Sequence, residues 1–143
     1  MRLRGRKHDL PPLVQAPPIS QLPEAKLQAG ARYLGTTTRG DEPARVTARG
    51  LGARSSCRLS LSAEGLDVIR LAGSFRVPSA ALRGGRRDDG FAGKPVPPHG
   101  VLVVSWQHGD LLLDTGFRLA DASTVELPNA WVRTIAKMTR TRG

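Results

Sequence analysis

The residues most suggestive of chemistry are Asp114-Thr115-Gly116, which follow three leucines and precede Phe117. An apolar run followed by Asp-Thr-Gly is the pattern around the catalytic carboxylate of aspartic proteases. Those enzymes need two carboxylates that share one proton, supplied by two copies of the motif or by a dimer. This chain has one copy, and the 27 residues after Gly116 are mostly helical in pattern. We therefore predict no catalytic residue and interpret the motif as a bend or bulge in a strand, with the Asp114 side chain tying down the backbone.

The remaining reactive side chains predict no active site, no metal site and no cofactor. The single Cys57 falls on the apolar side of a predicted strand, so we interpret it as a small core residue. The glycine-rich stretches lack the spacing of phosphate-binding loops, and Asp88-Asp89 beside Arg86-Arg87 indicate local charge pairing. A metal site would need histidines that converge with carboxylates, but the three histidines are far apart in linkers or turns: His8, His99 and His108.

Basic residues outnumber acidic ones, with 22 Lys+Arg against 12 Asp+Glu and a formal charge of +10. Such an excess attracts polyanions, either nucleic acid or anionic lipid. The candidate ligand-binding surface is a basic, glycine-rich loop, because guanidinium and ammonium groups suit phosphate or carboxylate. It comprises Arg83, Arg86, Arg87 and Lys94. Solvated basic termini would account for much of the same excess, so the charge alone identifies no partner.

Short apolar segments separated by turn residues predict about seven short antiparallel strands. In the clearest of them, residues 57–63, the side chains of Cys57, Leu59 and Leu61 share one face. The other expected strands are residues 29–37, 66–71, 74–78, 101–107 and 111–119, with a short apolar piece at Val46. Residues 79–100 are expected to be irregular, because glycine and proline recur there.

Residues 127–140 change to a helical period, in which Trp131, Ile135 and Met138 share one apolar face. A sheet of this many strands tends to curl, and the helix must bury its apolar face somewhere. The prediction is therefore a mainly β fold: a seven-stranded antiparallel barrel or curled sheet at residues 29–141, capped by one C-terminal helix. Trp131 is expected to be buried against Val103 and Leu113.

Residues 1–28 are predicted to be a basic, proline-rich linker of the juxtamembrane type, disordered or extended. The candidate membrane-proximal residues are Arg2, Arg4, Arg6 and Lys7. They occupy the place where the positive-inside rule puts charges beside a membrane-spanning helix, although an ordinary basic tail has the same composition. No run of the sequence reaches the roughly 18 apolar residues that span a bilayer. A hydrophobic anchor is therefore expected to precede Arg2 in the native gene product.

Four short motifs occur in order along the chain: Tyr33-Leu-Gly-Thr-Thr, Gly50-Leu-Gly, Ala92-Gly-Lys94 and Leu113-Asp-Thr-Gly-Phe117. From about Tyr33 to Arg118 the sequence resembles the actinobacterial PH-like (bacterial pleckstrin-homology-like) domain proteins. The resemblance implies a seven-stranded barrel plugged by a C-terminal helix. It also implies one N-terminal transmembrane helix before a basic run, and a place at the cytoplasmic face of the membrane. The shared residues are mainly glycines, turn formers and core apolar residues, which name no ligand.

Two functions are considered. The first is a non-catalytic binding module at the cytoplasmic membrane face, whose partner is an anionic membrane surface, a protein or peptide, or another anionic group. The second is nucleic-acid binding driven by the positive charge. Exposed aromatic residues that would stack on bases are scarce, because Trp106, Phe75 and Phe117 are expected in the core. Nucleic acid is thus the weaker alternative, beside an enzyme whose site the sequence does not reveal.

Overall fold

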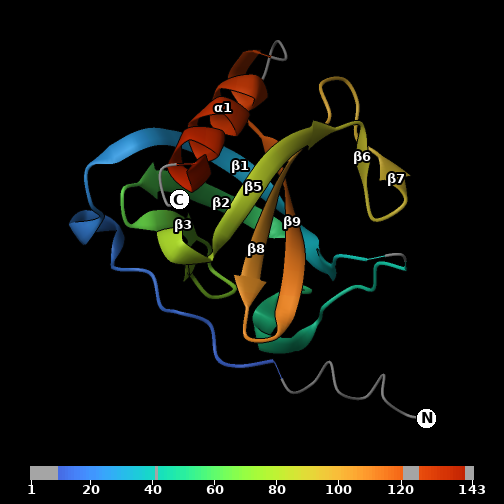
Figure 1. Cartoon of the computed structure of the whole chain (residues 1–143), viewed down its shortest axis with the longest axis horizontal. Coiled ribbons are helices and arrows are strands. Elements are labelled where there is room, and N and C mark those ends of the chain that lie inside the picture. The colour runs from blue at the N-terminus through green and yellow to red at the C-terminus, as the bar shows by residue number, and fades with distance from the viewer. Residues whose placement is uncertain (1–9, 41, 121–125, 141–143) are drawn as a thin grey trace.

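The computed structural model describes residues 10–40, 42–120 and 126–140, which form a curled antiparallel sheet and one helix (Figure 1). Seven strands lie in the order β4-β3-β2-β1-β9-β8-β5. Their bounds are β1 Ala25–Thr38, β2 Ser55–Ser62, β3 Gly65–Ile69, β4 Phe75–Pro78, β5 Leu82–Asp88, β8 Val101–His108 and β9 Leu111–Leu119. A small hairpin pairs β6 Gly90–Phe91 with β7 Lys94–Pro95, and the helix is α1 Glu126–Arg140. The mainly β fold with one C-terminal helix is confirmed.

The length of β1 allows the sheet to fold over on itself. Its first part pairs with β2, up to the Tyr33–Ser55 pair, and its second part pairs with β9 from Ala31 onward. Between Tyr33 and Gly35 the register with β9 shifts, so Leu34 is an extra residue in β1. Such a bulge bends a strand and increases its twist. One strand therefore belongs to both halves of the barrel.

The core lies between the two halves of the sheet and contains most of the aromatic residues. The rings of Tyr33, Phe75, Trp106 and Phe117 are at most 1% exposed and contact one another edge-on or stacked. Trp131 and Ile135 of α1 are also 0% exposed and complete this core. The predicted burial of the helix face is thus confirmed. In the core strands, too, the pattern of apolar residues correctly predicted which side chains face inward.

Of the two residues predicted to pack against Trp131, one belongs to its core cluster and the other does not. Leu113 belongs to the same core as Trp131, but Val103 belongs to a second, smaller cluster. Every residue of β8 from Val101 to Trp106 is buried, so the apolar side chains of this strand lie on both faces of the sheet. A continuous apolar run of this kind does not show which side faces the helix.

The segment predicted to be irregular, residues 79–100, contains the seven-residue strand β5 and the β6–β7 hairpin. That prediction was wrong, because the glycines of this segment allow close packing and do not interrupt the strand. Gly85 lies under α1, where an added Cβ would be 3.1 Å from Cδ1 of Ile135. Pairing with β8 from Leu82 to Asp88 holds the strand in place despite its two glycines.

The N-terminal segment is not a free linker over its described part. Leu10 is 1% exposed and belongs to the main core, and its carbonyl oxygen accepts a hydrogen bond from Arg49 Nε at 2.9 Å. Further along, the backbone N–H of Arg76 in β4 donates to the Val14 oxygen at 2.8 Å. Figure 1 shows this segment crossing the lower end of the barrel, away from α1. The predicted boundary at residue 29 is also late, since β1 begins at Ala25.

The predicted membrane-proximal residues Arg2, Arg4, Arg6 and Lys7 lie outside the described residues. Within the described ranges, no helix has the length and apolar character needed to span a bilayer.

The buried Arg70 fastens the loops at that lower end. Its Nη2 donates to the Gly50 oxygen at 2.8 Å and its Nε donates to the Gly73 oxygen at 2.7 Å. The guanidinium also lies 4.4 Å from the ring centre of Tyr33. Carbonyl oxygens and an aromatic face thus compensate a cation that is only 6% exposed. This arginine is a structural residue and is not available to a ligand.

Candidate functional site

The outer surface of the β1–β9–β8 region is covered by the β6–β7 hairpin. Leu34, Val101 and Val103 form a small buried cluster there, and Phe91 of the hairpin packs against it with Val96. An added Cβ on Gly116 would lie 2.8 Å from the Phe91 ring, a distance that real Cβ contacts do not show. The glycine of the Asp-Thr-Gly motif is therefore required for the hairpin ring to lie on the β9 backbone.

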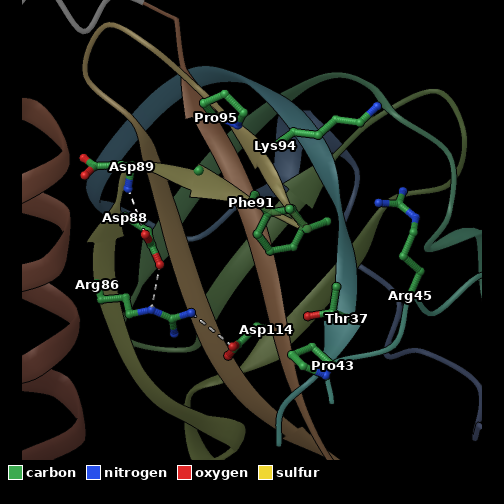
Figure 2. A pocket seen from close by; sticks show the side chains of 13 residues that line it. Thr37, Pro43, Arg45, Arg86, Asp88, Asp89, Phe91, Lys94, Pro95 and Asp114 are labelled. Atoms are coloured by element: carbon green, nitrogen blue, oxygen red, sulfur yellow. Dashed lines mark hydrogen bonds and ion pairs between the residues drawn. The ribbon is translucent and has the colours of Figure 1, made fainter. Parts of the chain in front are cut away.

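A pocket of about 610 Å³ lies between this hairpin and the outer surface of the sheet (Figure 2). Its volume is within the range of about 300–1,000 Å³ that is usual for small-molecule sites. The hairpin, the ends of β5 and β1, β9 and the segment after β1 all contribute to it. The lining residues are Thr37, Pro43, Arg45, Arg86, Asp88, Asp89, Gly90–Pro95 and Asp114.

Two of the lining cations have exposed side chains and no partner within the described ranges. Arg45 follows β1 and Lys94 lies in β7, and Figure 2 shows them on the same side of Phe91. Neither side chain forms an ion pair or a hydrogen bond with another residue in the described part of the chain. Each keeps its full set of N–H donors available at the pocket.

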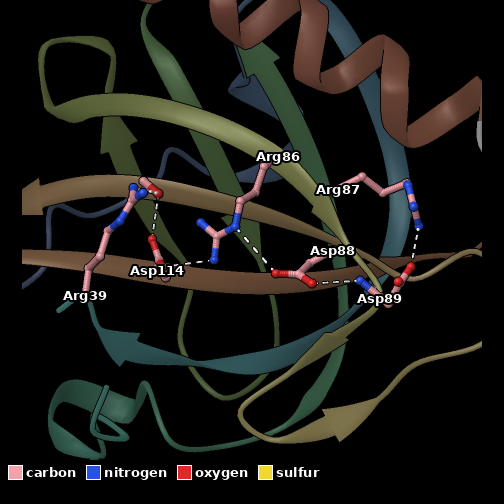
Figure 3. Close-up of polar contacts among 7 residues, drawn as sticks. Arg39, Arg86, Arg87, Asp88, Asp89 and Asp114 are labelled. Carbon is pink, nitrogen blue, oxygen red and sulfur yellow. Dashed lines mark hydrogen bonds and ion pairs between the residues drawn. The ribbon is translucent and has the colours of Figure 1, made fainter. Parts of the chain in front are cut away.

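The other side of the pocket is a polar wall built on β5, β8 and β9 (Figure 3). Ser105 Oγ donates to Oδ1 of Asp114 at 2.6 Å, and Arg86 Nη2 donates to its Oδ2 at 3.3 Å. Arg86 Nε also lies 3.6 Å from Oδ2 of Asp88. Behind them, Arg39 Nη1 donates to Ser105 Oγ at 3.0 Å.

This geometry differs from an aspartic-protease dyad. The guanidinium of Arg86 lies between Asp114 and Asp88, so a cation links the two carboxylates where a protease would have a shared proton. Two details of the predicted role of Asp114 were wrong. Its hydrogen-bond partners are the side chains of Ser105 on β8 and Arg86 on β5, and the bulge lies at Leu34 in β1.

The residue between Asp114 and Gly116 points to the core. Thr115 Oγ1 accepts a hydrogen bond from Trp106 Nε1 at 2.9 Å and shares another with Thr36 Oγ1 at 2.8 Å. The hydroxyl of Tyr33 lies 2.7 Å from Thr36 Oγ1 and donates to the Leu51 oxygen at 2.6 Å. Burial raises the pKa of the Tyr33 hydroxyl, which keeps it a neutral donor. Three of the four sequence motifs therefore meet in one buried network.

The predicted basic loop is divided by the fold. Arg86 and Lys94 line the pocket, whereas Arg83 and Arg87 do not. Arg83 Nη1 donates to the Ala80 oxygen at 2.8 Å. Arg87 follows Arg86 in a strand and therefore points to the opposite side, where its Nη1 donates to Asp89 at 3.3 Å and to the His99 oxygen at 3.2 Å.

Sequence reasoning missed Arg45 as a candidate site residue. It lies in the turn-rich connection between the Tyr33 and Gly50 motifs, next to residues with no clear period. Its backbone forms an isolated bridge with Thr37 near the end of β1, which brings its side chain to the pocket. The only feature of the sequence that could have indicated Arg45 was its position between two motifs of the family resemblance.

The other reactive groups do not add to this site. Cys57 packs against the core, and burial raises its pKa to about 11, so it is a poor nucleophile at neutral pH. Within residues 10–40, 42–120 and 126–140, no group of three or more His, Cys, Asp or Glu side chains is placed to hold a metal ion. His8 lies outside these ranges.

A family model described as bacterial PH domain-like matches residues 10–136 of this chain. The chain belongs to the bacterial PH domain-like family. Domains of the PH-like kind are in general binding modules without catalytic activity, which agrees with the geometry at Asp114. The match includes the packed N-terminal segment together with the barrel and most of α1. A search of curated proteins found no match.

Proposed function

We propose that this protein is a non-catalytic PH-like binding module that holds an anionic group of its ligand, a phosphate or a carboxylate, between Arg45 and Lys94. The observation that supports it most is that both cations lie at one pocket and have no ion-pair or hydrogen-bond partner among the residues that the structure describes. Hydrogen bonds from a charged donor to a charged acceptor are roughly twice as strong as those between neutral groups. The nearby surface of Phe91 and Pro43 would cover the apolar part of the ligand.

The proposal also places the module at the cytoplasmic face of the membrane. Leu10 is fastened in the barrel, so the basic residues from Arg2 to Lys7 are tethered within a few residues of it. Each basic residue near an anionic leaflet contributes roughly 1 kcal/mol, so four of them give weak, salt-sensitive adhesion. We expect the domain alone to remain soluble and a hydrophobic anchor to hold it at the membrane.

The pocket is tested by titrating the protein with phenyl phosphate and with benzoate while NMR signals are followed. We expect shifts in the hairpin residues, and about tenfold weaker binding in the double variant Arg45→Gln/Lys94→Gln. The matched control is Lys26→Gln/Arg58→Gln, which removes one lysine and one arginine from exposed positions of β1 and β2 outside the pocket. Equal weakening in both double variants would show that only net charge matters and would reject the pocket.

The same two variants separate the possible partners. Flotation with anionic and neutral vesicles measures membrane binding, and a salt titration against an oligonucleotide measures nucleic-acid binding. Strong oligonucleotide binding that survives in the pocket variant would favour the nucleic-acid alternative. Cell fractionation of the full gene product beside this chain tests the anchor. Finding both equally cytosolic at physiological salt would reject the membrane location.

A further inference from the structure

The pocket is lined by as many negative as positive side chains. Its cations are Arg45, Arg86 and Lys94, and its carboxylates are Asp88, Asp89 and Asp114. Asp89 is matched by Arg87, whose Nη1 lies 3.3 Å from Oδ1 of Asp89. A ligand that carries only negative charge would therefore meet carboxylates inside the same pocket. The protein as a whole is strongly basic, whereas the pocket lining contains equal numbers of positive and negative side chains.

The charges of the two signs are separated across the pocket. Figure 2 shows Arg45 and Lys94 on one side of Phe91, and Asp88 and Asp114 on the other. Arg86 is shared by Asp88 and Asp114, and Arg39 reaches Asp114 only through the hydroxyl group of Ser105. On the Arg45 and Lys94 side, neither cation forms an ion pair with a residue of the ranges 10–40, 42–120 and 126–140.

The carboxylate wall is able to accept further hydrogen bonds. Asp114 receives one short bond from Ser105 and one longer bond from Arg86, while a carboxylate has about four acceptor positions. The Asp114 side chain is 9% exposed and is held in place by these bonds. Asp88 is nearer to solvent, with 49% of its side chain exposed. The wall therefore presents one fixed and one accessible carboxylate.

Phe91 lies centrally between the two sides, and Thr37 lies below it, between Arg45 and Asp114 (Figure 2). A small ligand that bridges the pocket would place an apolar part against this ring.

Resting on the proposed function, we propose that the ligand is a small zwitterion of about dipeptide size. Its carboxylate or phosphate binds Arg45 and Lys94, and its ammonium group binds Asp88 and Asp114. The apolar part between them covers Phe91. Both charged groups of the ligand are then paired, whereas a simple anion gives the carboxylates of the wall no additional partner and is repelled by them.

The experiment compares four forms of one dipeptide, alanylphenylalanine, by NMR titration at low salt. They are the free zwitterion, the N-acetylated anion, the C-terminal amide cation, and the doubly blocked neutral form. We expect the zwitterion to bind about five- to tenfold more tightly than the N-acetylated form, as one additional charge-assisted hydrogen bond would give. The neutral form should bind most weakly.

A matched pair of carboxylate variants locates the effect. Asp88→Asn should reduce the preference for the zwitterion over the N-acetylated form about three- to fivefold, the range of a partly exposed ion pair. Asp110→Asn, an exposed position in the β8–β9 turn outside the pocket, should leave it unchanged. Equal changes in both variants would overturn the assignment of the ammonium group to this wall.

The outcomes separate the two proposals. Equal binding of the zwitterion and the N-acetylated form would overturn the zwitterion inference and leave the anion site intact. Equal binding of the zwitterion and the amide would overturn the anion site itself. Binding of none of the four forms at millimolar concentration would overturn the dipeptide-sized zwitterion.

Discussion

The two faces of strand β9 carry alternate residues of one motif and differ in what covers them. Thr115 and Phe117 point into the main core, whereas Asp114 and Gly116 point to the hairpin and its pocket. Asp114, Thr115 and Phe117 are all at most 6% exposed, so burial does not separate the faces. What differs is the surroundings: the main core on one face, and Arg86, Ser105 and the hairpin with its pocket on the other. One short motif thus packs into the core with some of its residues and lines the pocket with Asp114.

The largest effect is expected from Phe117→Ala on the core face. The ring is 1% exposed and packs edge-on against Tyr33 at 5.9 Å between ring centres. Its removal should lower the free energy of unfolding by about 3–5 kcal/mol, measured by urea denaturation. Phe91→Ala on the hairpin is the comparison and should cost less, because that ring is only partly buried. A larger cost for Phe91→Ala would contradict the assigned difference between the faces.

Thr115→Val keeps the shape of the side chain and removes its hydroxyl group. Trp106 Nε1 and the Thr36 hydroxyl would then lose a hydrogen-bond partner inside the core. We expect the free energy of unfolding to fall by about 2–3 kcal/mol, with a changed NMR shift of the Trp106 indole proton. An unchanged free energy of unfolding would show that the buried network contributes nothing to stability.

Gly116→Ala tests the outer face of the same strand. The new Cβ would lie 2.8 Å from the Phe91 ring, so the ring and its hairpin must shift. We expect a cost of about 1–2 kcal/mol and faster amide hydrogen exchange in residues 89–96. The double variant with Phe91→Ala should recover most of that cost, since the clash is then absent. Strictly additive costs would show that the two residues do not interact.

The smallest effect on stability is expected from Asp114→Asn. The amide oxygen can still accept the hydrogen bond of Ser105, and the lost ion pair is to Arg86, whose side chain is 42% exposed. The free energy of unfolding should fall by less than about 1 kcal/mol. No peptidase activity should be lost, because none is expected in the parent protein. Pepstatin-sensitive, acid-stimulated cleavage of a peptide library by the parent protein would contradict this.

The elements that were predicted correctly have a pattern that depends only on their own residues. Residues 57–63 alternate between apolar and polar, residues 111–113 form an apolar run, and Trp131 and Ile135 recur at helical spacing. Each pattern matches one face buried against a core. The strand β5 was missed because Arg-Gly-Gly-Arg-Arg has no such alternation and is held by β8 and by Ile135 of the helix.

The candidate site was predictable only in part, for a related reason. Arg86 and Lys94 were chosen as cations near glycines, and both line the pocket. Arg87 was grouped with them because neighbours in a loop can share a surface, but neighbours in a strand point to opposite sides. Arg45 was missed because its approach to the pocket depends on the end of β1.

The sequence by itself determined the fold class, the terminal helix and the burial of Trp106, Phe75 and Phe117, because periodicity and hydrophobic burial act over a few neighbouring residues. It also argued against catalysis at Asp114 through the single copy of the motif. Only the tertiary structure decided that Leu10 belongs to the core and that Arg45 and Lys94 line the same pocket. It also separated the cations of the pocket from Arg83 and Arg87. These arrangements depend on strand pairing between residues far apart in the chain, and no local pattern records which distant strand a residue will face.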